Sequence, residues 1–377
     1  MIGFADATGL SPPGVSPRRY LWTDAFAVCN FLELHRRTGE KRFKRLAKDL
    51  INQVHRILGR HRGDDRRTGW ISGLGEREGA LHPTAGGLRI GKPLPERGPG
   101  EPLDERLEWD RDGQYYHYLT KWMHALRQAG AVLGEADYLR WAVELAEATH
   151  AAFVYRTPAG SRQRMYWKMS IDLSRPLVPS MGLHDPLDGW ITCSELQAAV
   201  KGLHELPTPP LGREIAALSA MCAGINWGTD DPLGLGGLLA DAYRVGQLAA
   251  RGDFAPGELT ADLLDASLRG LAAFSVKNSL ALPAAYRLAF RELGLSIGLH
   301  GVRRLRTLIE ENPGISGNGM PLHGRVEALL RYERLASAIE AFWLDAASRE
   351  ASSWRDHGDI NDVMLATSLA PDGFLKL

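Results

Sequence analysis

The chain has 377 residues, of which 44% are apolar, and this is enough to build a large buried core. Its 45 basic and 45 acidic residues cancel, so no net charge favours nucleic acid or an anionic membrane as a partner. Three widely spaced cysteines argue against a disulfide framework and a zinc cluster, and we expect buried thiols, no metal and no cofactor. No stretch reaches about 18 consecutive apolar residues, which predicts a soluble, cytoplasmic protein.

The first predicted helices are residues 23–38 and 40–59, with Gly39 between them as the stop signal. Residues 62–108 follow as a long segment rich in glycine, proline and charge. A loop of this length in a compact domain is a lid, a binding loop or disordered. We expect it to cover the functional site, because its end runs directly into Trp109 and Asp110. Residues 70–72 and 87–90 are candidates for short strands within it.

The next predicted helices are residues 114–129 and 135–153, and a β-hairpin follows them. A turn at residues 158–160 precedes residues 165–171, which alternate between apolar and polar as a strand does. Helical spacing then continues to the end of the chain. The remaining predicted pairs are residues 189–206 with 213–227, 233–251 with 260–277, 284–298 with 302–311, and 326–348 with 359–369.

One helical motif occurs twice, at residues 39–50 and 134–145. Each copy begins Gly-Glu, places an aromatic residue at the same position and carries apolar residues at helical spacing. A glycine-terminated helix precedes each copy, so the repeating unit is a helical hairpin. Repeated hairpins bury their apolar faces by stacking into a solenoid or a closed ring. We therefore predict an all-α fold of about twelve helices in six hairpins, with small β-hairpins on one rim, as a single domain over residues 1–377.

A ring of this size with Gly-Glu-x-x-Phe/Tyr outer helices resembles the six-hairpin glycosidase-like (α/α)6 toroid superfamily. That superfamily contains glycoside hydrolases, sugar 2-epimerases and some polysaccharide lyases. The resemblance implies a site in the funnel at one end of the toroid, carbohydrate as the ligand and a role in carbohydrate metabolism. No specific family is matched, because the Trp-Trp-x-Gln-x-Glu segment of sugar 2-epimerases, a Cys-His-Gly segment and the unsaturated glucuronyl hydrolase signature are absent.

The strongest candidate site is the junction between the long loop and the helix that follows it. Carboxylates are stabilised at a helix N-terminus, and aromatic rings stack on the faces of sugars. An ordinary N-cap also explains an aspartate here, and we expect at least one of the two to be such a cap. The candidate residues of this junction are Trp109, Asp110, Asp112, Tyr115, Tyr116 and His117.

Two further segments place acidic and aromatic residues before a predicted helix. The first spans residues 184–190, where Asp-Pro also suits an ordinary turn, and the second spans residues 354–362. A closed ring would bring the second segment beside residues 22–24. On the predicted β-hairpin, Lys168 with Tyr166 is a candidate for binding an acidic sugar. The candidate residues of the two segments are His184, Asp185, Asp188, Trp190, His357 and Asp359.

Three functions remain open from the sequence. The first is glycoside hydrolysis, in which Asp110 or Asp112 pairs with Asp185 or Asp188 as base and acid. Helices pack 8–10 Å apart, which suits the carboxylate separation of an inverting enzyme. The second is sugar epimerisation or lyase chemistry, in which histidine or tyrosine transfers protons. The third is a non-catalytic toroid that binds a glycan or a protein; the sugar, its linkage and the oligomeric state are not specified by the sequence.

Overall fold

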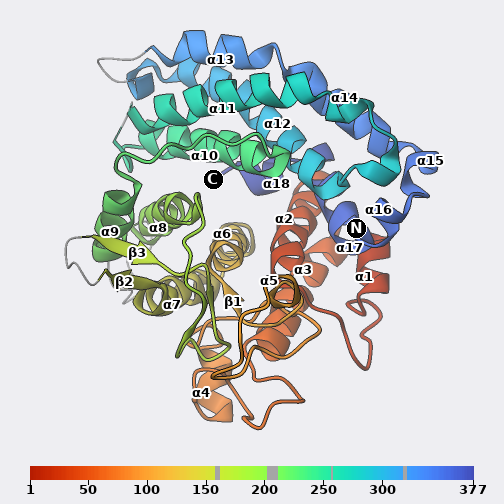
Figure 1. The fold of residues 1–377 in the computed structure, drawn as a ribbon, viewed down its shortest axis with the longest axis vertical. Coiled ribbons are helices and arrows are strands. Elements are labelled where there is room, and N and C mark those ends of the chain that lie inside the picture. The colour runs from red at the N-terminus through yellow and green to blue at the C-terminus, as the bar shows by residue number, and fades with distance from the viewer. Residues whose placement is uncertain (158–161, 202–210, 256–257, 317–320) are drawn as a thin grey trace. The chain divides into compact units, whose positions relative to one another are not determined.

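The computed structural model describes residues 1–157, 162–201, 211–255, 258–316 and 321–377. Over these residues the chain is mainly α-helical, with two small antiparallel sheets, and the predicted all-α class is confirmed (Figure 1). The chain divides into two compact units. The first is Ile2–Ala223, and the second is Gly224–Leu377 together with Met1. Closure of the helices into one toroidal domain involves both units and stays a prediction.

Three helical hairpins form most of the first unit. The predicted turn residues 207–210 between the last two helices lie outside the described residues. Three short helices, α1 (Ile2–Ala7), α4 (Glu76–Leu81) and α5 (Glu105–Glu108), complete this unit. The hairpins are α2 (Leu21–Thr38) with α3 (Lys41–Leu58), α6 (Tyr116–Leu133) with α7 (Ala136–Phe153), and α8 (Asp185–Lys201) with α9 (Gly212–Cys222).

The repeated motif forms the second helix of two of these hairpins. The preceding helices α2 and α6 end at Gly39 and Gly134, each with a φ of 72°, in the left-handed region that glycine adopts without strain. In α3, one stripe that includes Phe43, Leu46 and Leu50 is buried, and the opposite face is exposed. The motif is therefore scaffold, as its apolar spacing predicts.

The strands divide residues 163–178 between two sheets, so the prediction of one strand at residues 165–171 is wrong. Strands β2 (Val154–Arg156) and β3 (Gln163–Met165) pair with each other, whereas β4 (Lys168–Met169) lies between β1 (Gln114–Tyr115) and β5 (Pro176–Val178). The break falls at Tyr166 and Trp167, because the Tyr166 N–H donates to Phe153 and the Trp167 N–H donates to Val178. The predicted turn at residues 158–160 lies outside the described residues.

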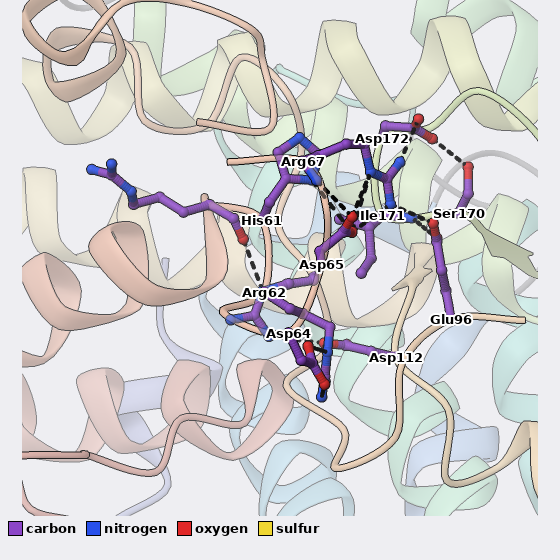
Figure 2. A network of polar contacts seen from close by, with 12 residues as sticks. His61, Arg62, Asp64, Asp65, Arg67, Glu96, Asp112, Ser170, Ile171 and Asp172 are labelled. Carbon is purple, nitrogen blue, oxygen red and sulfur yellow. Dashed lines mark hydrogen bonds and ion pairs between the residues drawn. The ribbon is translucent and has the colours of Figure 1, made fainter. Parts of the chain in front are cut away.

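The long loop is held in place by ion pairs, although the sequence permitted disorder there. Arg67 contacts Asp65, Glu96 and Asp172 at 2.7, 2.6 and 2.7 Å, which ties the loop to the segment after β4 (Figure 2). The candidate strands at residues 70–72 and 87–90 are not strands, and Trp70 makes only an isolated bridge to Arg60.

The second unit packs its helices around α10 and α12, which lie side by side (Figure 1). A Cβ atom on Gly236 of α10 would stand 2.0 Å from the carbonyl oxygen of Gly294, and one on Gly298 would stand 2.5 Å from that of Gly236. Gly236 and Gly298 therefore permit the close packing of α10 on α12. The helices are α10 (Pro232–Ala250), α11 (Glu258–Lys277), α12 (Ala289–Glu311), α13 (Leu322–Leu330), α14 (Glu333–Leu344), α15 (Ala346–Arg349), α16 (Ser352–Arg355), α17 (Gly358–Leu369) and α18 (Asp372–Leu375).

Two helix predictions in the second unit are wrong. Residues 284–298 and 302–311 do not form a hairpin, because α12 runs continuously from residue 289 to residue 311. Its glycines serve the close contact with α10 rather than a turn. Residues 326–348 form no single helix, because the chain breaks between α13 and α14. None of the helices in the described residues is long and apolar enough to cross a membrane.

Candidate functional site

Helices α6 and α8 face each other with basic groups on α6 and acidic groups on α8. Their side chains recur at spacings of three, four and seven residues, which places each set on one helix face. We name this set of contacts the α6–α8 ladder. Its three rungs are His117 Nδ1 with Asp185 Oδ1 at 3.7 Å, Lys121 Nζ with Asp188 Oδ1 at 2.6 Å, and His124 Nδ1 with Glu195 Oε1 at 2.8 Å.

The first rung differs from the other two. The second and third rungs are close enough for direct hydrogen bonds, and the side chains of His124 and Glu195 are each only 1% exposed. At 3.7 Å, His117 and Asp185 are too far apart for a direct hydrogen bond. Among the described residues, His117 Nδ1 and Asp185 Oδ2 have no hydrogen-bond partner although both atoms are buried. The first rung therefore has hydrogen-bonding capacity that the fold does not use.

The two groups of the first rung differ in protonation from ordinary surface residues. Burial raises the pKa of Asp185 to about 8; the nearby Asp188 adds to the rise, and Lys121 opposes it. Burial lowers the pKa of His117 to about 4. At neutral pH the carboxyl group carries a proton and the imidazole is neutral. The rung thus combines an acid with a base.

Aromatic rings form a wall beside His117. The ring of Trp167 lies nearly parallel to it, at 6.2 Å and 13°, and the ring of Tyr115 stacks on it at 5.4 Å. Pairing of β1 with β4 places Tyr115 opposite Lys168, next to Trp167 in the chain. Trp109 meets the edge of Trp167 at 5.2 Å and is 55% exposed. The Tyr115 hydroxyl is a third buried polar atom that lacks a hydrogen-bond partner among the described residues.

The structure brings together part of the predicted site. Trp109, Tyr115, His117 and Asp185 belong to this cluster, and Asp188 supports it through Lys121. Three other predicted residues of the first unit lie close by in the chain. Asp110 is exposed on the turn before β1, and His184 and Trp190 are half-buried at the start of α8.

Asp112 has contacts that favour an anchoring role. Its carboxylate is fully buried, meets Arg89 at 2.8 Å and accepts hydrogen bonds from the backbone N–H groups of Gly91 and Lys92. It also meets Arg62 at 3.3 Å (Figure 2). These contacts connect both ends of the long loop. Because every oxygen is engaged with the protein, Asp112 is a poor candidate for catalysis, and we leave it out of the proposed site.

Tyr116 and Lys168 are also used by the fold. Tyr116 is 1% exposed, and a Cβ atom on Gly189 would stand 2.4 Å from its hydroxyl oxygen, so it packs in the core against α8. Lys168 is fully buried and donates 2.8 Å hydrogen bonds to the side chain and carbonyl of Glu108 and to the carbonyl of Arg111. Because both side chains are engaged by the fold, we leave Tyr116 and Lys168 out of the proposed site.

His357 and Asp359 belong to the second unit. His357 is exposed at the start of α17, with its ring against the edge of Phe290 at 5.6 Å. Asp359 lies in the first turn of that helix. Their approach to residues 22–24 would join the two units and stays a prediction.

The sequence reasoning missed three residues of the cluster. Lys121 follows His117 by four residues, a helical spacing that identifies it as a neighbour. Trp167 was assigned to a continuous strand, which hid the change of partner at that residue. Tyr118, whose ring meets His117 edge-on at 4.7 Å, has no sequence signal beyond its place in an aromatic run.

No family model and no curated protein sequence matches this chain. Among solved structures it is similar to the cellobiose 2-epimerase of Spirochaeta thermophila DSM 6192, at 13% identity and a TM-score of 0.46, over 86% of this chain and 88% of that chain. It is also similar to the cellobiose 2-epimerase of Bacillus thermoamylovorans B4167, at 9% identity and a TM-score of 0.46, over 93% of this chain and 88% of that chain.

Proposed function

We propose that this chain is a carbohydrate-active enzyme that transfers protons on a sugar, with His117 and Asp185 as its acid–base pair. One observation carries the proposal. Tyr115, His117 and Asp185 each hold a buried polar atom that has no hydrogen-bond partner among the described residues; the ring of Tyr115 stacks on that of His117, and Asp185 adjoins His117. Buried polar atoms without a hydrogen-bond partner are costly, and exposed aromatic rings favour an apolar face to stack on. A sugar satisfies both, because its hydroxyl groups form hydrogen bonds and its C–H faces stack on aromatic rings.

The protonation states support epimerisation or isomerisation of an open-chain sugar. The neutral imidazole of His117 removes the proton from the carbon next to the carbonyl group. Asp185 donates its proton to the carbonyl oxygen, which gives an enediol and leaves an imidazolium and a carboxylate. The imidazolium of His117 then returns a proton to carbon while the carboxylate of Asp185 takes an O–H proton from the enediol, which restores both groups. Addition to the opposite face of the same carbon, once the enediol has turned that face toward His117, gives the epimer, and addition to the former carbonyl carbon gives the isomer. Lys121 keeps Asp188 paired throughout and holds α8 in place.

Hydrolysis of a glycoside is the second candidate, because the raised pKa of Asp185 also suits a general acid. Asp185 and Asp188 lie one turn apart on the same helix face, so they do not flank a bond from opposite sides. The second carboxylate would then be Asp110, since Asp112 is held by two arginines. Proton transfer needs only the pair already in place, and we prefer it for this reason.

The test is a panel of reducing mono- and disaccharides, including cellobiose, incubated with the protein and separated by chromatography. An epimer or isomer supports proton transfer, whereas shorter sugars support hydrolysis. With the substrate so found, Asp185→Asn and His117→Gln should each lower kcat/KM by about 10²–10⁴-fold. The control is Asp6→Asn at an exposed position on α1. Losses below tenfold for both site variants would remove the pair from the mechanism.

A further inference from the structure

Lys92 of the long loop lies at the edge of the same aromatic cluster. Its Nζ stands 5.3 Å from the centroid of the Tyr20 ring. The Tyr20 hydroxyl is 2.6 Å from the hydroxyl of Tyr118, and the Tyr118 ring meets His117 at 4.7 Å. Two tyrosine side chains, Tyr20 and Tyr118, therefore connect this lysine to His117 of the proposed acid–base pair.

The charge of Lys92 is not paired as those of its neighbours are. The ammonium group of Lys168 donates hydrogen bonds to three oxygen atoms, and that of Lys121 donates one to Asp188. Lys92 is half-buried. Among the described residues its ammonium group forms no ion pair and no hydrogen bond, and its nearest described partner is the face of the Tyr20 ring. Asp112, whose carboxylate accepts from the Lys92 backbone, meets two arginines instead. Asp110 and Asp112 act on this half-buried cation only through longer-range charge, so an anionic ligand at hydrogen-bond distance would stabilise it further.

We propose that Lys92 is an anion-binding residue of this site and that the substrate is an acidic sugar bearing a carboxylate, a uronic acid. The proposal rests on the proposed function, because it takes the cluster around His117 as the sugar site. One lysine matches the single charge of a carboxylate. A phosphate is recognised best by arginine forks, and the nearby guanidinium groups of Arg62 and Arg89 are bound to Asp112.

The paired tyrosines complete the carboxylate site. Burial raises the pKa of Tyr20 to about 12, so its hydroxyl keeps its proton and remains a hydrogen-bond donor at neutral pH. Burial also lowers the pKa of Lys92, while the charges of Asp110 and Asp112 oppose the change. A bound carboxylate would stand between an ammonium group and a hydroxyl donor, both in partly desolvated positions, where charge-assisted hydrogen bonds are strongest.

The test measures binding of glucuronate and galacturonate against glucose, galactose and glucose 6-phosphate by calorimetry. The wild-type protein should bind a uronate at least tenfold more tightly than the matching neutral sugar. Lys92→Met should abolish this difference and leave the affinity for the neutral sugar within threefold. Lys92→Arg should keep the preference, and Lys41→Met, at an exposed position at the start of α3, serves as the control. A melting temperature and circular dichroism spectrum like those of the wild type establish that each variant is folded.

The outcomes separate this inference from the proposed function. Neutral sugars that bind and turn over as well as uronates overturn the role of Lys92 and leave the acid–base pair standing. A preference for glucose 6-phosphate over the uronates overturns the carboxylate assignment. A uronate preference that survives in Lys92→Met places the anion elsewhere and also overturns it. If no sugar of either kind binds, the proposed function fails, and the inference fails with it.

Discussion

The protonated state of Asp185 has a direct consequence for stability. The pKa of its buried carboxyl group is about 8, against an ordinary value of 3.8 that applies in the unfolded chain. Between these values the folded protein binds one proton more than the unfolded chain. The free energy of unfolding therefore falls with rising pH, by about 1.4 kcal/mol per pH unit from this group alone. The stabilising contribution is complete below about pH 4 and is lost by about pH 8.

Asp185→Asn should remove this slope, because an amide does not titrate. Relative to the wild type, the variant should gain about 3 kcal/mol in unfolding free energy between pH 5 and pH 7. Urea denaturation at pH 5, 6 and 7 measures the difference, and contributions from other groups cancel in it to first order. A difference between the two proteins that stays constant over this range would refute the assigned burial of Asp185.

Asp172→Asn is the matched control. Burial opposes ionisation of Asp172, but hydrogen bonds from Ser174 and Ser170 outweigh it and bring the pKa down to about 2. The carboxylate is then ionised in both states between pH 5 and pH 7. Its removal should shift stability by an amount that does not depend on pH in this range, with a cost from the lost contact to Arg67.

Three further outcomes are expected. Gly236→Ala should lower the unfolding free energy by about 1–3 kcal/mol or more, because its Cβ would stand 2.0 Å from a backbone oxygen. The control Gly237→Ala, with no atom within 4 Å of the added Cβ, should be neutral or stabilising. Equal effects of the two variants in thermal melts would contradict the packing of α10 on α12. Lys168→Met should cost about 3–5 kcal/mol in denaturant unfolding, since buried acceptors lose their shared cation, and a loss under 1 kcal/mol would contradict this. The pH profile of kcat/KM should be bell-shaped, falling below about pH 4 as His117 gains a proton and above about pH 8 as Asp185 loses one, and a profile flat from pH 3 to pH 9 would exclude both groups.

Local patterns predicted the helices well where one face is buried and a glycine ends the element. The repeated Gly-Glu motif is an example, since its apolar stripe and the left-handed glycine before it are properties of short segments. The same rule failed at residues 298–301, because the glycines there allow close contact with α10, which lies some sixty residues away in the chain. Only the packed structure shows whether a glycine permits a turn or a close contact.

The sequence likewise showed the local segments of the site but not how they pack together. An aromatic, acidic segment before α6 and another before α8 were visible, and they supplied His117 and Asp185. Their pairing was not visible, because it depends on which faces of α6 and α8 meet. Nor did the sequence distinguish Asp185 from Asp112, which have the same side chain. The difference is that Asp112 meets two arginines that come from a loop, whereas Asp185 is buried beside a neutral imidazole.

The most direct test of the proton-transfer account is isotope exchange. The substrate found in the sugar panel is incubated with the protein in D₂O and followed by proton NMR. The imidazolium of His117 exchanges its proton with D₂O, so the account predicts deuterium at the carbon that receives the returning proton, which lies next to the carbonyl group in an epimer and is the former carbonyl carbon in an isomer. His117→Gln should lack this exchange, and Asp6→Asn should retain it. Turnover without deuterium at either of these carbons, or full exchange in His117→Gln, would contradict the account.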